Sequence, residues 1–456
     1  MLANKTFNYL LVFISALLYL YFAYFLNRSD FYLLLGLYSV LFLILTNLLK
    51  NADLNFKQLT YISIVFYALF LFSTPNLSQD FYRFIWDGRM LANGISPYLF
   101  TPNEILKQNP EIIPQAQDLV NGMQNLNASH YSNYPPVSQW IYVLAAAIAP
   151  KSILGATIVM RIILILANVG ILYFGKKILG HLNLPLNNIF WFSLNPLIIL
   201  ELVGNLHYEG LMLLFLLAAI YFILKQKTRI AALFFGLSVA TKLLPLVLLP
   251  IFYRFFSQNH KPTSIFRNKN LLQFIQFTAL SIFVFILSFW GLIEEHFFKN
   301  FSSSIALWFG TFEFNASFYY LFRWIGFQLV GWNTIATLSK IGSVSIFIYI
   351  LYLAFLKKTS SQKAIFQLLL FGVSFYFLFS TTVHPWYIAT PLLLSVFTRF
   401  KFLIVWSFTV ILSYAAYQNE IYTEKIGLIA LEYTLVLGYL IYDLLCLKKK
   451  KSVFLK

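Results

Sequence analysis

Residues 7–26 read FNYLLVFISALLYLYFAYFL, and residues 31–49 read FYLLLGLYSVLFLILTNLL. Neither run contains a charged residue, and each has the length of about 20 residues that an α-helix needs to cross the hydrocarbon core of a bilayer. Similar runs recur along the whole chain. The pattern therefore predicts an all-α polytopic membrane protein.

Apolar runs of spanning or near-spanning length recur at intervals along the chain. They occupy residues 7–26, 31–49, 58–73, 154–175, 186–203, 209–224, 271–290, 335–356, 364–382, 386–398, 402–417 and 426–446. Three shorter apolar pieces, 136–149, 230–241 and 243–256, are interrupted by prolines and a lysine, and we interpret them as re-entrant helices. We expect about twelve transmembrane helices in a single integral membrane domain over residues 1–456.

The composition supports the same class of protein. Of 456 residues, 60% are hydrophobic and 11% are charged, whereas a soluble domain carries roughly 25% charged residues. Cys446 is the only cysteine, which excludes a disulfide scaffold and a thiolate zinc site. The net charge of +17 does not indicate nucleic acid, because the basic residues form short clusters between apolar runs rather than one soluble face.

The distribution of charge predicts an orientation. If the twelve runs alternate from a cytoplasmic N-terminus, most Lys and Arg residues fall in cytoplasmic segments and most acidic residues fall outside. Both termini are then cytoplasmic, in a multi-pass protein of the cell membrane. The two long loops, 74–135 and 291–334, face the extracytoplasmic side, and loops of such length are usually functional.

The first long loop opens with SQDFYRFIWDGR at residues 78–89. On a helix, Asp80, Arg83 and Asp87 would share one face by their spacing of three and four residues. This pattern suits a general base beside arginines, Arg83 and Arg89, that bind a phosphate at the membrane surface. An interfacial amphipathic helix with Arg–Asp pairs would show the same spacing.

Three motifs of this loop carry a family resemblance. They are Asp80-x-Tyr-x-x-x-x-Asp87-Gly-Arg89, Gly94-x-Ser-Pro-Tyr98 and Tyr134-Pro-Pro136. Together they resemble the first-loop signature of the C-type glycosyltransferase superfamily. The similarity is closest to the GPI mannosyltransferase I type and to bacterial polyprenol-phosphate-mannose-dependent mannosyltransferases.

The resemblance implies a catalytic acid in this loop and a sugar donor linked to polyprenyl phosphate. The eukaryotic relatives often carry two acids spaced Asp-x-Asp, but Ser78-Gln79-Asp80 supplies only one here. The catalytic role therefore falls on Asp80, and Tyr134 joins the expected substrate contacts.

Two further groups of polar residues interrupt apolar runs. Asn205, His207 and Glu209 lie at a turn that we expect outside, where they could bind sugar hydroxyls or form a polar helix–helix turn. Lys242 lies within an apolar stretch, where its ammonium could hold a lipid phosphate or extend to the cytoplasmic face.

The C-terminal half contributes the remaining candidates. Glu313 and Asn315 lie among aromatic residues, a combination that suits a pyranose ring, although aromatic belts are ordinary at a membrane interface. His384, Trp386 and Tyr387 follow an apolar run at a proline, where the histidine could contact a phosphate or an acceptor or serve a structural role.

The sequence therefore predicts a membrane glycosyltransferase that moves a hexose from a polyprenyl-phosphate sugar to a lipid or glycan acceptor. We expect an inverting displacement with Asp80 as base, while Arg83, Arg89 and His384 stabilise the leaving phosphate. No metal or other cofactor is required, because phosphate is already a good leaving group, and the partners are membrane lipids, donor and acceptor, with no nucleic acid. The alternative is a transporter or flippase of a lipid-linked sugar.

The orientation is testable with introduced cysteines. Asn103→Cys and Ser303→Cys should react with a membrane-impermeant thiol reagent in intact cells, because both positions lie in the predicted outer loops. Ser360→Cys should not react. Labelling at position 360 alone would overturn the orientation.

Overall fold

The computed structural model describes residues 2–51, 54–257, 269–357, 359, 361–419 and 422–453. In this part of the chain every regular element is a helix, and one isolated β-bridge joins Phe314 and Thr382. The all-α class is therefore confirmed. Ser360, which the labelling experiment uses, lies outside the described residues.

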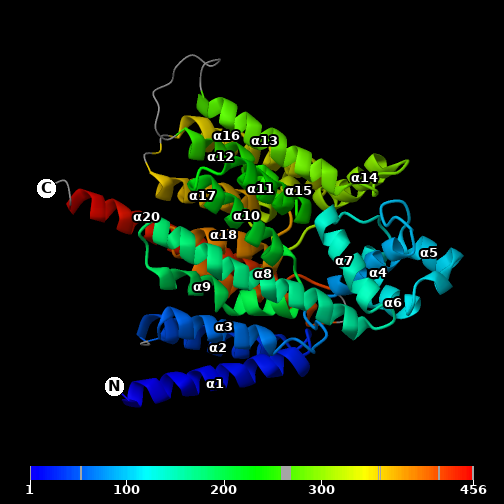
Figure 1. Cartoon of the computed structure of the whole chain (residues 1–456), viewed down its shortest axis with the longest axis horizontal. Helices are drawn as coiled ribbons and strands as arrows, with labels where there is room; N and C mark the ends of the chain where they lie inside the picture. The colour runs from blue at the N-terminus through cyan, green and yellow to red at the C-terminus, as the bar shows by residue number, and fades with distance from the viewer. Residues whose placement is uncertain are drawn as a thin grey trace.

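The N-terminal half contains three helices, then a group of short helices, then a long helix (Figure 1). Their bounds are α1 (Leu2–Tyr24), α2 (Phe31–Asn51), α3 (Phe56–Ala68), α4 (Asp80–Ala92), α5 (Pro102–Gln108), η1 (Pro110–Ile112), α6 (Ala116–Ala128), α7 (Pro136–Ile148) and α8 (Ile153–His181). The group α4–α7 forms one end of the molecule, and the longer helices extend from it toward the other end.

The middle of the chain contains more broken helices. These are η2 (Leu186–Ile189), α9 (Phe190–Ser193), the π-helix η3 (Ile198–Gly204), α10 (Glu209–Leu224), α11 (Thr228–Thr241), α12 (Leu244–Phe256) and α13 (Lys269–Ser288).

The C-terminal part completes the helical bundle. It comprises α14 (Phe297–Gly310), α15 (Phe318–Val330), α16 (Ile335–Leu351), η5 (Tyr352–Leu356), α17 (Gln362–Phe379), η6 (Pro385–Ile388), α18 (Ala389–Ser395), α19 (Phe402–Thr409), η7 (Val410–Tyr417) and α20 (Ile426–Val453).

Seven helices in the described ranges are long and apolar enough to cross a membrane. An eighth span results if η2–α9 and η3, which are bent by 64° at Pro196, are counted as one. The predicted run at 386–398 forms only the short elements η6 and α18, since Pro385 and Pro391 interrupt helix geometry. The expected number of about twelve spans stays a prediction.

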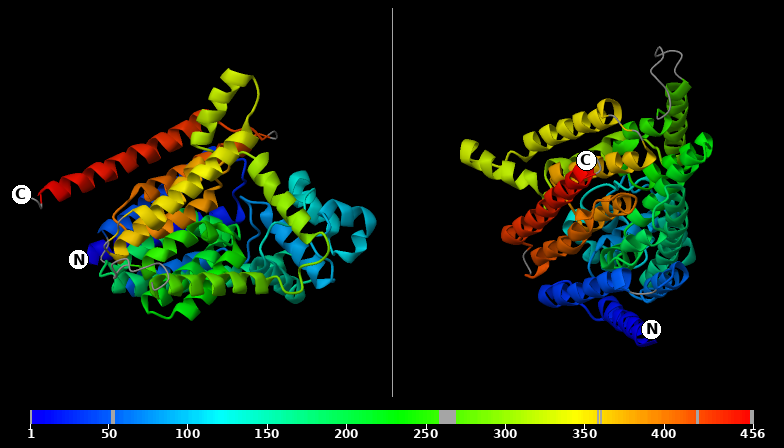
Figure 2. Two further views of the ribbon diagram at one scale, coloured as in Figure 1. Left: turned by 90° about the horizontal axis from the view of Figure 1, so that it is seen from above. Right: turned by 90° about the vertical axis from the view of Figure 1, so that its left-hand side faces the viewer.

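Both described chain ends lie at the end of the molecule opposite the α4–α7 group (Figure 2). Contacts between helix ends agree with this placement. The Lys176 ammonium at the end of α8 lies 4.4 Å from the ring centroid of Phe56 at the start of α3. His181 also meets Gln362 at the start of α17, at 3.0 Å. The end of α8 therefore lies beside the starts of α3 and α17, at the same end of the molecule as the two described chain ends.

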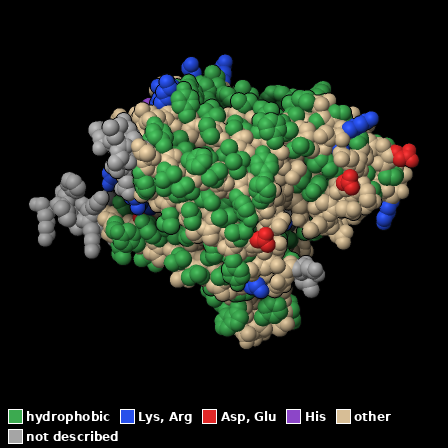
Figure 3. Space-filling model, turned by 90° about the horizontal axis from the view of Figure 1, so that it is seen from below, with side chains coloured by type: hydrophobic (Ala, Val, Ile, Leu, Met, Phe, Trp, Pro, Cys, Tyr) green, Lys and Arg blue, Asp and Glu red, His purple; other side chains and the backbone are tan. Residues whose placement is uncertain are grey.

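The two long loops meet at the other end. The Asn300 side chain on α14 donates to the carbonyl of Tyr98 (3.1 Å), and the Ser304 hydroxyl donates to the carbonyl of Tyr131 (2.9 Å). Seen from below, hydrophobic side chains cover the middle of the molecule, and Lys and Arg gather toward the end that carries the termini (Figure 3). The orientation of the protein in the membrane stays a prediction.

Helix α7 packs against α4 rather than crossing the bundle. A Cβ at Gly88 would overlap the backbone of Tyr142, so glycine is needed where the two helices touch. Trp140, Leu144 and Ile148 are exposed at four-residue intervals along α7. One apolar stripe on a helix beside the outer loops is typical of a helix that lies at a membrane interface.

A buried arginine joins three parts of the fold. The Arg161 guanidinium of α8 donates hydrogen bonds to the carbonyls of Val203 (3.0 Å) and Gly204 (2.9 Å) at the end of η3. It also donates to the carbonyls of Leu71 (3.1 Å) and Ser73 (2.6 Å) after α3. Both segments stop being helical here, so their carbonyls would otherwise lack partners away from water.

Replacing Arg161 should therefore destabilise the protein without touching the polar site described below. Arg161→Met leaves four buried carbonyls without a donor, and each such group costs about 1–3 kcal/mol. We expect a large loss of folded protein and a lower midpoint in a thermal unfolding assay in detergent. Lys225→Met at an exposed position is the matched control, and equal stability of both variants would refute the role of Arg161.

Candidate active site

Side chains from four breaks in the helical pattern converge at the end of the bundle where α4 begins. Lys242 forms an ion pair with Glu209, and its ammonium lies 5.8 Å from the ring centroid of Tyr387. The His207 ring stacks on Trp386 with centroids 3.6 Å apart, and His384 stacks on Trp386 at 4.4 Å. The structure thus brings together residues that lie far apart in the sequence.

Asp80 is the first residue of α4, and its side chain is half-buried. Burial raises the pKa of this carboxyl above the ordinary value, and the negative charge of Glu209 raises it further. The positive charges of Lys242 and Arg28 lower the pKa, as does a hydrogen bond with Asn127. Such opposing effects are typical of a carboxylate that exchanges a proton near neutral pH.

The turn at residues 205–208 holds His207 against Trp386. The Asn205 amide oxygen accepts from the backbone N–H of Leu77 (3.2 Å), and its nitrogen donates to Glu201 (3.3 Å). The Tyr414 hydroxyl also donates to Glu201 (2.5 Å). Asn205 and Glu201 are buried, so we infer that they position His207 from behind rather than contact a substrate.

Lys242 has an extended backbone conformation and separates α11 from α12. Glu209 is the first residue of α10, and His207 lies two residues before it, so the ion pair places the Lys242 ammonium on the same side as Asp80. The sequence left open whether the Lys242 ammonium binds a lipid phosphate at the site or extends to the cytoplasmic face, and the geometry favours a position at the site. Its side chain is 23% exposed while that of Glu209 is 2% exposed, so the lysine is the accessible partner.

His384 lies in a non-helical segment between α17 and η6. The backbone of Phe314 pairs with this segment: its N–H donates to the carbonyl of Thr381 (3.1 Å), and its carbonyl accepts from Val383 (2.8 Å). The Phe314 ring also stacks on His384 at 4.8 Å. The second long loop therefore positions His384 beside Trp386.

The 311–317 loop is itself held by buried polar groups. The Asn315 side chain donates to Glu432 (3.3 Å), and its backbone N–H donates to Glu424 (2.6 Å). Glu313 pairs with Arg323 and accepts from the Tyr319 hydroxyl (2.6 Å). Asn315 therefore supports the loop. Glu313 belongs to a separate polar group, whose other members, Tyr319 and Arg323, lie on α15.

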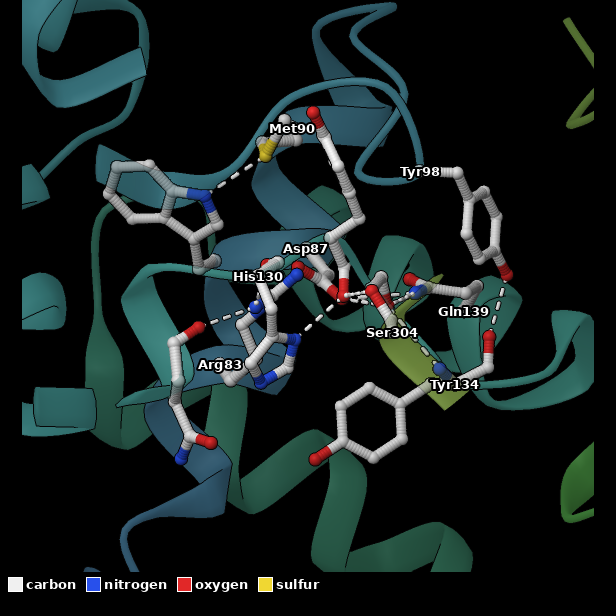
Figure 4. Close-up of polar contacts among 12 residues, drawn as sticks. Arg83, Asp87, Met90, Tyr98, His130, Tyr134, Gln139 and Ser304 are labelled. Atoms are coloured by element: carbon white, nitrogen blue, oxygen red, sulfur yellow. Dashed lines mark hydrogen bonds and ion pairs between the residues drawn. The ribbon is translucent and has the colours of Figure 1, made fainter. Parts of the chain in front are cut away.

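Arg83 and Asp87 hold the first loop together (Figure 4), and Arg89 adds contacts to the same loop. The Arg83 Nε atom lies 2.6 Å from Asp87 Oδ1, and its Nη1 donates to the carbonyls of Asn127 and His130. Asp87 also accepts from Ser132 (2.6 Å) and Gln139 (3.0 Å). Arg89 donates to Pro114 and Gln115. We infer structural roles for these three residues; for Arg83 and Arg89 this role replaces the expected phosphate contacts.

Tyr134 lies between this network and Asp80. Its backbone carbonyl accepts from the Tyr98 hydroxyl (2.6 Å), and its ring meets Phe84 edge-on at 5.1 Å. Burial raises the pKa of the Tyr134 phenol well above the ordinary value, and Asp80 adds to this effect. The half-buried hydroxyl is therefore protonated and available as a donor near Asp80.

One residue near Asp80 escaped the sequence-based expectations. Arg28, in the turn between α1 and α2, lowers the pKa of Asp80, and its guanidinium carbon lies 3.2 Å from the ring centroid of Tyr417. A usable signal existed, because Arg28 is one of few basic residues on the predicted outer side. Across the described ranges, no group of three His, Cys, Asp or Glu side chains could hold a metal ion.

Comparisons with known proteins agree on one family. Residues 18–257 match the family model described as alpha-(1->6)-mannopyranosyltransferase, N-terminal domain. The chain is 26% identical over 182 residues to alpha-(1->6)-mannopyranosyltransferase B of Corynebacterium glutamicum, covering 40% of this chain and 29% of that protein. It is 20% identical over 225 residues to alpha-(1->6)-mannopyranosyltransferase A of Mycobacterium tuberculosis, covering 49% and 41%.

A third relative, alpha-(1->6)-mannopyranosyltransferase A of Corynebacterium glutamicum, is 22% identical over 200 residues, covering 44% of this chain and 38% of that protein. The matches thus span less than half the length of these relatives. The family match includes Arg28, Asp80, His207, Glu209 and Lys242, whereas His384 lies beyond it.

The two aspartates of the first loop should respond differently to loss of charge. Asp87→Asn leaves the Arg83 guanidinium buried beside a neutral group, and breaking a buried ion pair costs about 3–5 kcal/mol. Asp80→Asn should cost no stability, because burial already disfavours the charged form of this carboxyl. Thermal unfolding of purified protein measures both, with exposed Asp118→Asn as control. Equal destabilisation by the two substitutions would contradict the assigned roles.

Proposed function

The chain belongs to the alpha-(1->6)-mannopyranosyltransferase family, and we propose that it transfers a mannosyl group from polyprenyl-phosphate mannose to an acceptor hydroxyl at the extracytoplasmic membrane surface. One observation carries this proposal: Asp80, two cationic side chains and two histidines meet where an apolar helical bundle ends. A lipid-linked donor keeps its chain in the bilayer, so its phosphate and sugar would lie at this depth.

The proposed reaction is a single displacement with inversion at the sugar carbon. Asp80 accepts the proton of the acceptor hydroxyl as its oxygen attacks carbon 1 of the sugar. The bond from carbon 1 to the phosphate oxygen breaks, and its electrons leave with the polyprenyl phosphate. General-base catalysis by a positioned carboxylate contributes about 10²–10⁴ in rate.

The rings of His207, Trp386 and His384 form a stacked platform beside the base. Trp386 lies between the two histidines, with interplanar angles of 14° and 5°. Burial lowers the pKa of His384 to about 3, and the nearby Lys242 and Arg28 add to the shift. A neutral imidazole would donate a hydrogen bond to a sugar or phosphate oxygen without repelling the two cations.

A transporter or flippase of a lipid-linked sugar is the alternative function. It requires ionisable groups that line a path through the membrane. The buried ionisable residues inside the helices have protein partners instead: Arg161 binds four carbonyls, Glu201 binds Tyr414, and Glu432 binds Trp406 (2.9 Å). The family match also names transferases, so we favour the enzyme.

Substitution of Asp80 tests the base. Asp80→Asn should retain its fold but lose about 10²–10⁴ of the transfer rate, measured with membranes or purified protein and labelled polyprenyl-phosphate mannose at saturating donor. Asp118→Asn should keep its rate. Near-normal turnover of Asp80→Asn would remove Asp80 from the catalytic role.

The same assay has an expected pH dependence. Because burial raises the pKa of Asp80, the rate should fall on acidification at a higher pH than for an exposed aspartate, whose pKa is about 3.9. The groups that oppose the shift are Lys242, Arg28 and Asn127, whereas Glu209 reinforces it. Removing the charge of Lys242 should therefore move the acid limb of the profile to still higher pH.

A further inference from the structure

The Arg28 guanidinium forms no ion pair with a carboxylate in the part of the chain that the structure describes. Its Nη1 donates to the Gln79 side-chain oxygen (3.1 Å), and its face covers the Tyr417 ring. The Nε atom is buried and has no hydrogen-bond acceptor among the residues that the structure describes. Over the same residues, none of the ion pairs involves Arg28.

The turn that carries Arg28 is fastened to the loop that carries Asp80. The Asn76 amide donates to the carbonyls of Phe22 (2.6 Å) and Leu26 (2.7 Å), which end α1. Gln79, which accepts from Arg28, directly precedes Asp80 and also donates to Gln124 (3.2 Å). These contacts hold the guanidinium near the carboxylate before any substrate binds, which lowers the entropic cost of binding an anion.

Lys242 is the other cation near Asp80, but its charge is already balanced. Its ammonium contacts the Glu209 carboxylate directly, whereas the contacts that Arg28 makes among the described residues are with a neutral amide and a phenol ring. A positive charge that pairs closely with a carboxylate has less attraction left for an incoming phosphate. Arg28 is also a planar guanidinium, whose donors match phosphate oxygens better than those of an ammonium.

We propose that Arg28 binds the phosphate of the lipid-linked donor and takes up the charge that develops on it as the sugar departs. This assignment rests on the proposed function. The donor phosphodiester carries one negative charge, and the released polyprenyl phosphate monoester carries up to two. No group previously expected to bind the phosphate combines a free charge with this proximity to Asp80.

The movement of charge during the reaction explains why one arginine serves two groups. Before transfer, the positive charge of Arg28 helps to balance the Asp80 carboxylate. When Asp80 accepts the acceptor proton, the carboxyl becomes neutral and the bonding electrons move to the phosphate oxygen. The charge of Arg28 is then available for the leaving group, at the moment when the phosphate needs it.

Binding of a short prenyl phosphate tests this assignment without requiring turnover. The full-length protein in detergent is titrated with farnesyl phosphate and, separately, with farnesol, which lacks the phosphate. Wild type should bind farnesyl phosphate more tightly. Arg28→Gln should weaken that binding by about 10- to 100-fold, because a hydrogen-bonded charged group is lost, and should leave farnesol binding unchanged. Exposed Lys107→Gln, on α5 in the first long loop, is the matched control.

Each further result supports or overturns the assignment. If Arg28→Gln yields too little folded protein, Arg28→Lys decides, since lysine keeps the charge but not the planar fork. A several-fold loss for farnesyl phosphate alone supports Arg28, and unchanged affinity overturns its role. If Lys242→Gln loses phosphate binding while Arg28→Gln keeps it, the assignment to Arg28 is wrong but the proposed function stands. If wild type does not distinguish the two probes, the prenyl-phosphate donor fails, and the role of Arg28 fails with it.

Discussion

The structure depends on the hydrogen bonds that Arg161 makes inside the helical bundle. A chain that leaves helical geometry away from water must find donors for its free carbonyls, because an unpaired buried polar group is costly. Arg161 supplies those donors to two segments at once, after α3 and at the end of η3. Both segments then lead directly into parts of the polar site, one to Asp80 and the other to His207.

The chemistry is accordingly concentrated where helices break. Asp80 begins a helix after a loop, Lys242 separates two helices, and His384 precedes a proline. At such places side chains and backbone groups are free to bind a ligand, while the helices keep their positions fixed. Lys242 and Glu209 can remain at the edge of an apolar interior because they pair with each other.

Under the proposed function, the charged residues of the first loop divide between a catalytic role for Asp80 and structural roles for Arg83 and Asp87. Arg83 and Asp87 lie on the buried side of α4 and bind the segment from Asn127 to Gln139. Asp80, half-buried at the start of the same helix, lies near the cations Lys242 and Arg28 of other elements. The spacing of three and four residues left open a general base beside arginines or a helix with Arg–Asp pairs. The structure assigns the Arg–Asp pair to Arg83 and Asp87 and leaves Asp80 as the candidate base.

The sequence by itself determined the all-α membrane class, because uncharged runs of spanning length are local signals, and it singled out Asp80, His207, Lys242 and His384 as polar residues at interruptions of those runs. Tertiary structure alone decided which charges face one another. Lys242, at the end of α11, pairs with Glu209 at the start of α10. Arg28 lies near Asp80 because Asn76 and Gln79 bind the turn between α1 and α2, about 50 residues earlier in the chain. Sequence spacing carries no information on such contacts, since they depend on how helices pack and on which buried charges are already paired.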